Sequence, residues 1–164
     1  MNLPVGNVLK EGVNLKDVKF SNIISTLMKE HFTGYIVLTV EGYSGIEEGL
    51  ILFRKGIIIG SIFDYSKFQV TVYGGSALEQ SFNSSNVHFG VFDICALSTQ
   101  QVDLVTAFNE KIKLEITVTA KNLNKLIPNK YEVKYAKKVL ADALKREETK
   151  FDVFRKLGLS GINQ

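Results

Sequence analysis

Apolar positions recur first at helical and then at strand spacing along the first third of the chain. Ser21, a residue type that favours the start of a helix, precedes four apolar residues at the spacing of one helix face: Ile23, Ile24, Leu27 and Met28. Gly34 then opens GYIVLTVEG, a run rich in β-branched and aromatic residues. The pattern predicts a helix over residues 21–31 and a strand directly after it.

The most apolar stretch is GLILFRKGIIIGSIFDY, residues 49–65, which basic residues interrupt only once. It predicts two strands, residues 50–53 and 57–63, joined by a solvated turn at RKG, residues 54–56. Three loop residues that end in glycine are a common closure of a β-hairpin. The preceding segment EGYSGIEEG, residues 41–49, has three glycines and no period, so it predicts a turn between two strands.

Further elements are indicated before residue 128. FQVTVYGG and VHFGVFDICAL are typical of strands, and SALE, residues 76–79, predicts a capped helix that ends at about residue 84. STQQ, residues 98–101, supplies a second capping box and opens a helix with one apolar side. LEITVT alternates with period two, which predicts an edge strand, although β-branched residues inside a continuing helix would give a similar pattern.

Pro128 separates this region from a Lys-rich tail. Beyond it, six apolar residues form a helical stripe: Val133, Ala136, Val139, Leu140, Ala143 and Leu144. A second short helix, ETKFDVFRKLG, places Phe151, Phe154 and Leu157 at spacing three. The sequence therefore predicts an α+β domain at residues 1–127, built on an antiparallel sheet packed with helices, and a basic helical appendage at residues 128–164.

Both faces of the apolar hairpin at residues 49–65 lack the alternation with polar residues that a solvated sheet face shows, so each face needs a cover. The helices at 21–31 and near 99–110 can cover one face. The other face is left for the tail, a second copy of the chain, or a partner. The candidate partner-binding residues are Ile58, Ile62, Phe151, Phe154 and Leu157. Aspartate in place of Ile62 is expected to disrupt this contact and to leave the sheet intact.

The net charge changes sign along the chain. Residues 1–120 hold nine Lys/Arg and twelve Asp/Glu, a net charge of −3, whereas residues 121–164 hold eleven and five, a net charge of +6. The candidate anion contacts of the tail are Lys134, Lys137, Lys138, Lys145 and Arg146. These residues favour phosphate contacts with nucleic acid, whereas Asp142, Glu147 and Glu148 interrupt the basic face and disfavour an anionic membrane. A tail docked on its own domain with solvated lysines is the alternative.

Composition is that of a folded globular chain without a disulfide. Hydrophobic residues make up 45% of the 164 residues, and Cys95 has no second cysteine to pair with. No apolar run approaches the roughly 20 residues that span a bilayer, and the polar N-terminus lacks the apolar core of a signal peptide. We therefore expect a cytoplasmic protein.

Residue types with catalytic or metal-binding chemistry are sparse. His31, His88 and Cys95 are too few for a zinc site, which takes four ligands. The sequence has neither the lysine-bearing P-loop motif nor a G-x-S-x-G nucleophile elbow. Glu47 and Glu48 are adjacent, and adjacent side chains on a strand point apart, so an acid–base pair is not expected. The sequence predicts no catalytic residue, no metal and no cofactor.

The order of the elements resembles a known plan. A helix, F-x-G, a strand, a strand ending in F-x-x-G, a glycine-bearing strand and an Ala-Leu helix are similar to the PatA-type N-terminal domain of bacterial response regulators. The residues at these places are Phe32, Gly34, Phe53, Gly56, Gly60, Ala77 and Leu78. GIEEGLILF, FDICALSTQQVDLVTAFNEK and FRKLGL resemble still more closely an archaeal family of uncharacterised proteins. The resemblance covers roughly residues 20–112 and implies a non-catalytic interaction module, often found beside signalling components.

One function class and one alternative follow from these patterns. We expect a non-enzymatic protein-interaction or scaffold module, associated with signalling, that binds a protein partner or a second copy of itself as a homodimer. The alternative is a nucleic-acid-associated protein that binds through the basic C-terminal helices. No small-molecule substrate is indicated.

Overall fold

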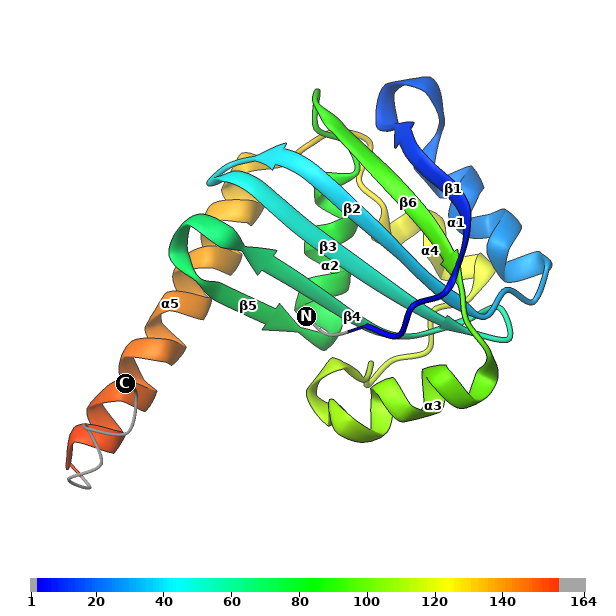
Figure 1. The fold of residues 1–164 in the computed structure, drawn as a ribbon. Helices are drawn as coiled ribbons and strands as arrows, with labels where there is room; N and C mark the ends of the chain where they lie inside the picture. The colour runs from blue at the N-terminus through cyan, green and yellow to red at the C-terminus, as the bar shows by residue number, and fades with distance from the viewer. Residues whose placement is uncertain (1–2, 157–164) are drawn as a thin grey trace.

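The computed structural model describes residues 3–156 as a six-stranded antiparallel sheet with helices packed on it (Figure 1). The strand order is β1-β6-β2-β3-β4-β5, and all pairings are antiparallel. The strands are β1 (Asn7–Asn14), β2 (Gly34–Gly42), β3 (Gly45–Arg54), β4 (Ile57–Tyr65), β5 (Val70–Tyr73) and β6 (Gly90–Ala96). This confirms the predicted α+β class.

Four helices lie on one side of the sheet, which we call the helix-covered face. They are α1 (Phe20–Lys29), α2 (Gly74–Ser84), α4 (Ala120–Leu126) and α5 (Val133–Lys156). The fifth, α3 (Thr99–Phe108), lies on the opposite side, near one end of the strands (Figure 1). Three single-turn 3-10 helices are η1 (Leu15–Asp17), η2 (Ser66–Phe68) and η3 (Glu110–Ile112).

The largest apolar core lies between the helix-covered face and α1, α2 and α4. Ile24 of α1 and Phe82 of α2 are fully buried and pack in one cluster with Ile36 of β2 and Phe53 of β3. The helical spacing of apolar residues in α1 and their alternation in β2 place these side chains on the facing sides of the two elements. Removal of such side chains from water is the main stabilising contribution to the fold.

Both turns of the central hairpins are tighter than the sequence predicts. β3 already begins at Gly45, so only Tyr43 and Ser44 form the turn after β2, and most of segment 41–49 is strand. Lys55 and Gly56 alone join β3 to β4, with φ angles of 50° and 77°. Two central residues with positive φ match the twist of paired strands, whereas the sequence suggested a three-residue loop.

One predicted helix start is confirmed, whereas a second helix start and the strand predicted after α3 are wrong. The capping box of α3 is present, since Ser98 and Gln101 exchange hydrogen bonds of 3.2 and 2.8 Å. α2 instead begins at Gly74, without a side-chain cap, so the predicted start at Ser76 is wrong. The LEITVT segment is not a strand, because between η3 and α4 only Lys113 forms an isolated bridge, to Gly60.

The predicted hairpin faces are wrong because β4 contains a β-bulge. Leu52 pairs with Gly60 but Phe53 pairs with Ile58, so one extra residue of β4 stands between the two pairs. The shift places Ile58 in the core under the helix-covered face and Ile62 in a cluster on the opposite face. Both side chains are buried within the chain, and they do not share one contact surface.

The tail forms one continuous helix, α5, instead of the two short helices that the sequence predicts. Its first half packs on β4, β5 and α2 through Val139, Leu140 and Ala143. Asn83 of α2 holds the residue before α5: its Nδ2 donates to the Glu132 carbonyl at 3.1 Å, and its Oδ1 accepts from the Glu132 amide at 2.7 Å. The division at residues 127 and 128 stays a prediction, and these contacts show how the two parts are joined.

Replacing Asn83 with alanine is expected to loosen this junction. The change removes both hydrogen bonds to Glu132 and is expected to lower the free energy of unfolding by about 1–3 kcal/mol. Urea unfolding measures the loss, and limited proteolysis of residues 128–132 measures the local opening. Asn129→Ala at an exposed position is the matched control. Equal protection of residues 128–132 in the two variants would contradict this role of Asn83.

Candidate functional site

Side chains on the face opposite the helix-covered face form rows across the strands, as the strand pairing shows. The row nearest α3 contains Cys95, Tyr35, Leu52 and Gly60. The next row contains Asp93, Val37, Leu50, Ile62 and Tyr73. The third row contains Val91, Thr39, Glu48, Asp64 and Thr71. We call the second and third rows the open face, because α3 stands at the other end of the strands and no helix lies in front of these rows in Figure 1.

Contacts with the sheet hold α3 at its end of this face. Val102 and Val105 pack in one cluster with Leu52 of β3. Arg54 donates two hydrogen bonds to Asp103, from Nε to Oδ1 at 2.7 Å and from Nη2 to Oδ2 at 3.1 Å. These hydrogen bonds also lower the pKa of the Asp103 carboxyl. α3 is therefore a fixed border of the open face.

Gly60 brings η3 against β4 and completes this border. A Cβ at position 60 would stand 2.9 Å from the carbonyl oxygen of Ile112, which is closer than real Cβ atoms approach. The Leu114 amide donates to the Ile59 carbonyl at 3.0 Å just beside it. A glycine inside a strand often marks such a close approach of another backbone segment.

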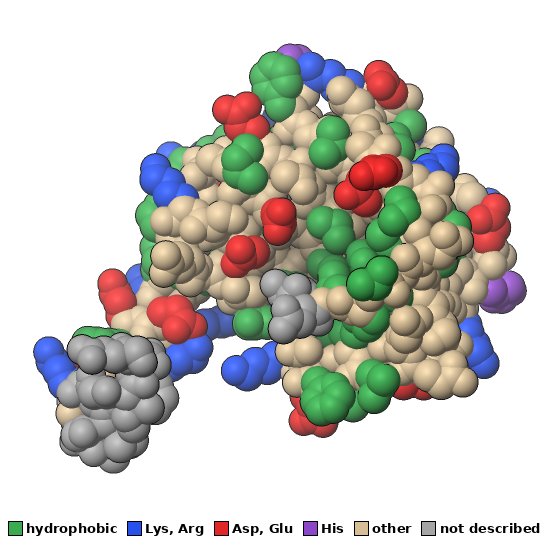
Figure 2. Space-filling view, viewed as in Figure 1, with side chains coloured by type: hydrophobic (Ala, Val, Ile, Leu, Met, Phe, Trp, Pro, Cys, Tyr) green, Lys and Arg blue, Asp and Glu red, His purple; other side chains and the backbone are tan. Residues whose placement is uncertain are grey.

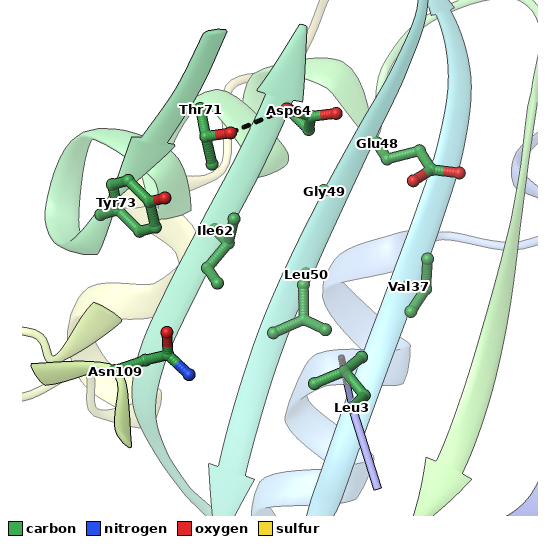
Figure 3. Close-up of a pocket in the computed structure, with 10 residues that line it drawn as sticks. All are labelled: Leu3, Val37, Glu48, Gly49, Leu50, Ile62, Asp64, Thr71, Tyr73 and Asn109. Carbon is green, nitrogen blue, oxygen red and sulfur yellow. Dashed lines mark hydrogen bonds between the residues drawn. The ribbon is translucent and has the colours of Figure 1, made fainter. Parts of the chain in front are cut away.

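A groove of about 500 Å³ lies on the open face (Figure 3). We call it the sheet groove. It is lined by Leu3, Val37, Glu48, Gly49, Leu50, Ile62, Asp64, Thr71, Tyr73 and Asn109. Figure 3 shows Leu3 close to Leu50 and Val37, with Tyr73 and Asn109 at the left of the view, beyond Ile62. The floor is apolar, and the end of the groove away from α3 carries two carboxylates.

The two carboxylates of the sheet groove stand side by side on neighbouring strands. Glu48 of β3 and Asp64 of β4 are directly paired across the two strands, so their side chains project from the same face. Thr71 donates a hydrogen bond of 2.9 Å to Asp64 Oδ1. No ion pair joins Glu48 or Asp64 to any basic side chain among residues 3–156. Like charges directly opposite each other destabilise a sheet, and a cationic partner would relieve this repulsion.

Acidic and exposed apolar side chains also surround the sheet groove on the rest of the open face. Asp93 ends the second row and Val91, which is exposed, ends the third. Ile46, also exposed, pairs with Glu41 beyond the third row. Figure 2 shows acidic and apolar side chains over the centre of this view, with the visible Lys and Arg side chains around its margin. The surface therefore suits a partner that combines apolar and basic side chains.

The predicted partner-binding residues do not come together at this site. Ile62 lies in the floor of the groove, but Ile58 is buried on the helix-covered face. Phe151 lies on α5 and is 60% exposed. Phe154 is part of α5 but its side chain is not described, and Leu157 lies outside the described residues. Phe151, the one of these three tail residues whose side chain is described, is not part of the cluster around Ile62.

The predicted anion contacts are exposed along α5. Lys134, Lys137, Lys138, Lys145 and Arg146 all stand in solvent. Lys137 Nζ lies 5.1 Å from the centre of the Tyr43 ring, a cation–π contact. The first four lie on the side of the helix opposite Val139, Leu140 and Ala143, because residues three, four, seven and eight apart share a face.

Glu48 and Asp64 were not predicted as site residues. Segment 41–49 appeared as a loop, so the alternation of Glu47 and Glu48 in β3 was hidden. The expectation that these two side chains point apart is confirmed, since Glu47 is fully buried and Glu48 is exposed. Thr39, Glu48 and Asp64 are polar residues of three neighbouring strands, and each lies within or beside an apolar run. These three polar positions are the signal that could have indicated the third row.

Glu47 belongs to a buried polar cluster under the start of α5. Ser44 donates from its amide and its hydroxyl to Glu47 Oε1, both at 2.8 Å. Glu47 Oε2, the Tyr65 hydroxyl and the Tyr131 hydroxyl are buried and make no hydrogen bond with another described group. Burial raises the pKa of the Glu47 carboxyl, while the Ser44 hydrogen bonds act in the opposite direction. Burial, with the nearby Glu47 charge, also raises the pKa of Tyr131 to about 12.

Glutamine in place of Glu47 is expected to stabilise the fold at neutral pH. A carboxyl whose pKa is raised by folding contributes stability that is fully present below its ordinary pKa of 4.5 and is lost as pH rises through the raised value. Glutamine keeps the acceptor for Ser44 and does not ionise. Thermal unfolding from pH 4 to 8 should therefore show that the melting temperature of the variant rises relative to that of the wild type as pH rises. Glu115→Gln, at an exposed position outside the sheet, is the control. A stability difference between Glu47→Gln and the wild type that stays constant across this pH range would contradict the burial effect.

Two kinds of site were not found in the described part of the chain. Residues 3–156 contain no group of three or more His, Cys, Asp and Glu side chains placed to hold a metal ion. Within the same range no helix has the length and apolar character needed to cross a membrane.

A family match places these features in a wider group. Residues 1–109 match the model of a family described as "Uncharacterized protein conserved in archaea (DUF2226)". The chain belongs to this archaeal family. The match spans β1 to α3 and includes all ten residues of the sheet groove, whereas α4 and α5 lie outside it. No curated protein and no solved structure matches the chain.

Proposed function

We propose that the protein is a non-enzymatic interaction module that binds a protein partner on its open face. The observation that carries this proposal is the Glu48–Asp64 pair, which has no basic partner among residues 3–156 and lies beside the apolar floor of the sheet groove. A partner segment with basic and apolar side chains would neutralise the pair and fill the groove. Such complementarity favours rapid association and discriminates against acidic partners.

We also propose a more specific role, which rests on the order of the helices and strands along the chain. The element order resembles the PatA-type N-terminal domain of bacterial response regulators, and we propose by that analogy a scaffold role beside signalling components in the cytoplasm. Fold-level analogy supports a class of function and not a particular partner. The open face supplies the physical reason for binding, and the analogy supplies the setting.

Photo-crosslinking from the open face tests the proposal. A benzophenone amino acid replaces Thr39, which is half-buried in the third row, and the full chain is irradiated in an extract of its native cells. We expect discrete protein adducts. Adding Glu48→Lys and Asp64→Lys should abolish them, because the surface then repels a basic partner.

The matched control carries Glu110→Lys and Glu115→Lys, two exposed acidic positions outside the sheet. It changes the net charge by the same amount and should leave the adducts intact. Adducts that are equal in all three proteins, or a background smear alone, would contradict the open face as an interaction site.

The exposed basic side of α5 favours nucleic-acid binding as a second candidate function. Phosphate contacts by Lys134, Lys137 and Lys138 would give binding that weakens steeply with salt and is largely blind to sequence. Fluorescence anisotropy with a duplex oligonucleotide at 50 to 200 mM salt tests this candidate. It predicts a salt-dependent signal that Lys137→Glu with Lys138→Glu removes, and the absence of a wild-type signal at 50 mM would refute it.

A further inference from the structure

The second half of α5 extends beyond the sheet that its first half covers (Figure 1). Val139, Leu140 and Ala143 are buried, but after Leu144 every described side chain of the helix is exposed. The helix nevertheless continues to Lys156. Isolated helical segments of this length are marginal in water, so a helix half without tertiary contacts gains much from a partner.

The apolar stripe of α5 continues into this exposed half. Phe151 follows Leu144 by seven residues, two helical turns, and so lies on the same side of the helix as the packed residues. Its side chain is 60% exposed, although Leu144 and Leu140, two and three turns earlier, pack on the domain. The stripe therefore presents an apolar surface with nothing of its own domain beneath it.

We propose that the second half of α5 from one copy of the chain docks in the sheet groove of a second copy. This inference rests on the proposed function of the open face and names its occupant. Phe151 enters the apolar floor, and basic side chains of the helix approach Glu48 and Asp64. Exchange in both directions fills both grooves and closes the assembly as a symmetric dimer.

Charge complementarity supports this occupant. Lys150 directly precedes Phe151 and Arg155 follows it by four residues, so both cations lie near Phe151 on the helix surface, together with Glu147 and Glu148 one turn earlier. Each is ion-paired within the helix, Lys150 with Glu147 and Arg155 with Asp152, but these pairs are solvent-exposed. Exposed pairs of this kind contribute little, so both cations can turn to a stronger acidic partner. The open face offers that partner in Glu48 and Asp64.

Geometry excludes the groove of the same copy. The first half of α5 packs on the helix-covered face, and the groove lies on the other face. Because the helix is continuous to Lys156, its second half does not fold back around the sheet edge. Residues 145–156 extend about 18 Å at 1.5 Å per residue. The second row spans five strands, about 19 Å at the usual strand spacing, so one row accommodates this segment.

Sedimentation equilibrium of the purified full chain, from 1 to 200 μM, tests the inference. We expect a monomer–dimer equilibrium for the wild type. Phe151→Asp alone, Lys150→Glu with Arg155→Glu, and Glu48→Lys with Asp64→Lys should each weaken dimerisation at least tenfold. Combining the last two pairs reverses both charges and should restore the dimer, which a merely unfolded variant would not do. Lys134→Glu, on the packed half of α5, is the control that should leave it unchanged.

The outcomes separate this inference from the proposed function. A wild type that stays monomeric at 200 μM, or a dimer that none of the variants weakens, overturns docking between copies. If the monomeric wild type still forms open-face adducts in cell extract, the proposed function stands with another partner. Absence of both the dimer and the adducts overturns both.

Discussion

Replacement of Ile62 by aspartate is expected to destabilise the fold severely, by about 4 kcal/mol or more, instead of leaving the sheet intact. Ile62 is only 6% exposed and packs with Leu50, Leu52 and Ile112. The substitution removes an apolar side chain from this cluster and puts a charged group in its place. Guanidinium unfolding followed by circular dichroism measures the loss.

Ile57→Asp is the matched control, because Ile57 is an exposed residue of the same strand. Exposed substitutions usually change stability by about 0.5 kcal/mol or less. If Ile62→Asp unfolds at the same denaturant concentration as Ile57→Asp, the cluster under the groove is not a packed core. The sequence expectation that the sheet stays intact took Ile62 as a surface contact, whereas its burial in this cluster favours loss of stability.

Alanine in place of Gly34 is expected to have a comparable effect, through the backbone. Gly34 has a φ of +149°, and a Cβ there would stand 2.1 Å from the carbonyl oxygen of Cys95. Since β2 and β6 are paired at this point, relief of the clash requires the two strands to separate. We expect a loss of about 3 kcal/mol or more, with unfolding at 37 °C if the wild type is of ordinary stability.

Gly45→Ala separates the clash from the backbone strain. Gly45 has a φ of +106°, but no atom lies within 4 Å of the place that a Cβ would take, so only strain of about 1–3 kcal/mol applies. The two variants compared by thermal unfolding should differ clearly, with Gly34→Ala the less stable. Equal melting temperatures would show that the β2–β6 pairing adapts to a side chain at position 34.

Much of the fold follows from local patterns in the sequence. The helical spacing before Gly34, the strand that it opens and the capping box of Ser98 all correspond to observed elements. β1 was not indicated, because its eight residues are almost all exposed and show no apolar alternation. The continuity of α5 was also hidden, since the charged residues between its two apolar groups are equally compatible with a break.

The candidate site depends on relations that a linear pattern does not contain. Glu48 and Asp64 are sixteen residues apart in the chain and meet because β3 and β4 pair in a particular register. The bulge beside Gly60 sets that register, and a glycine within a strand suggests a bend there without giving the pairing of the strands. The extension of α5 past the sheet depends in turn on Asn83 and on the packing of Val139 and Leu140.

Docking of α5 on the open face of another copy can be observed directly by paramagnetic relaxation between copies. One chain, without ¹⁵N, carries a spin label at Glu148→Cys, an exposed position on α5. This chain is mixed with ¹⁵N-labelled wild type. The account predicts strong broadening of amide signals of Thr39, Leu50 and Thr71, with little effect on α1. Equal broadening of α1 and the open face, or none on either, would contradict it.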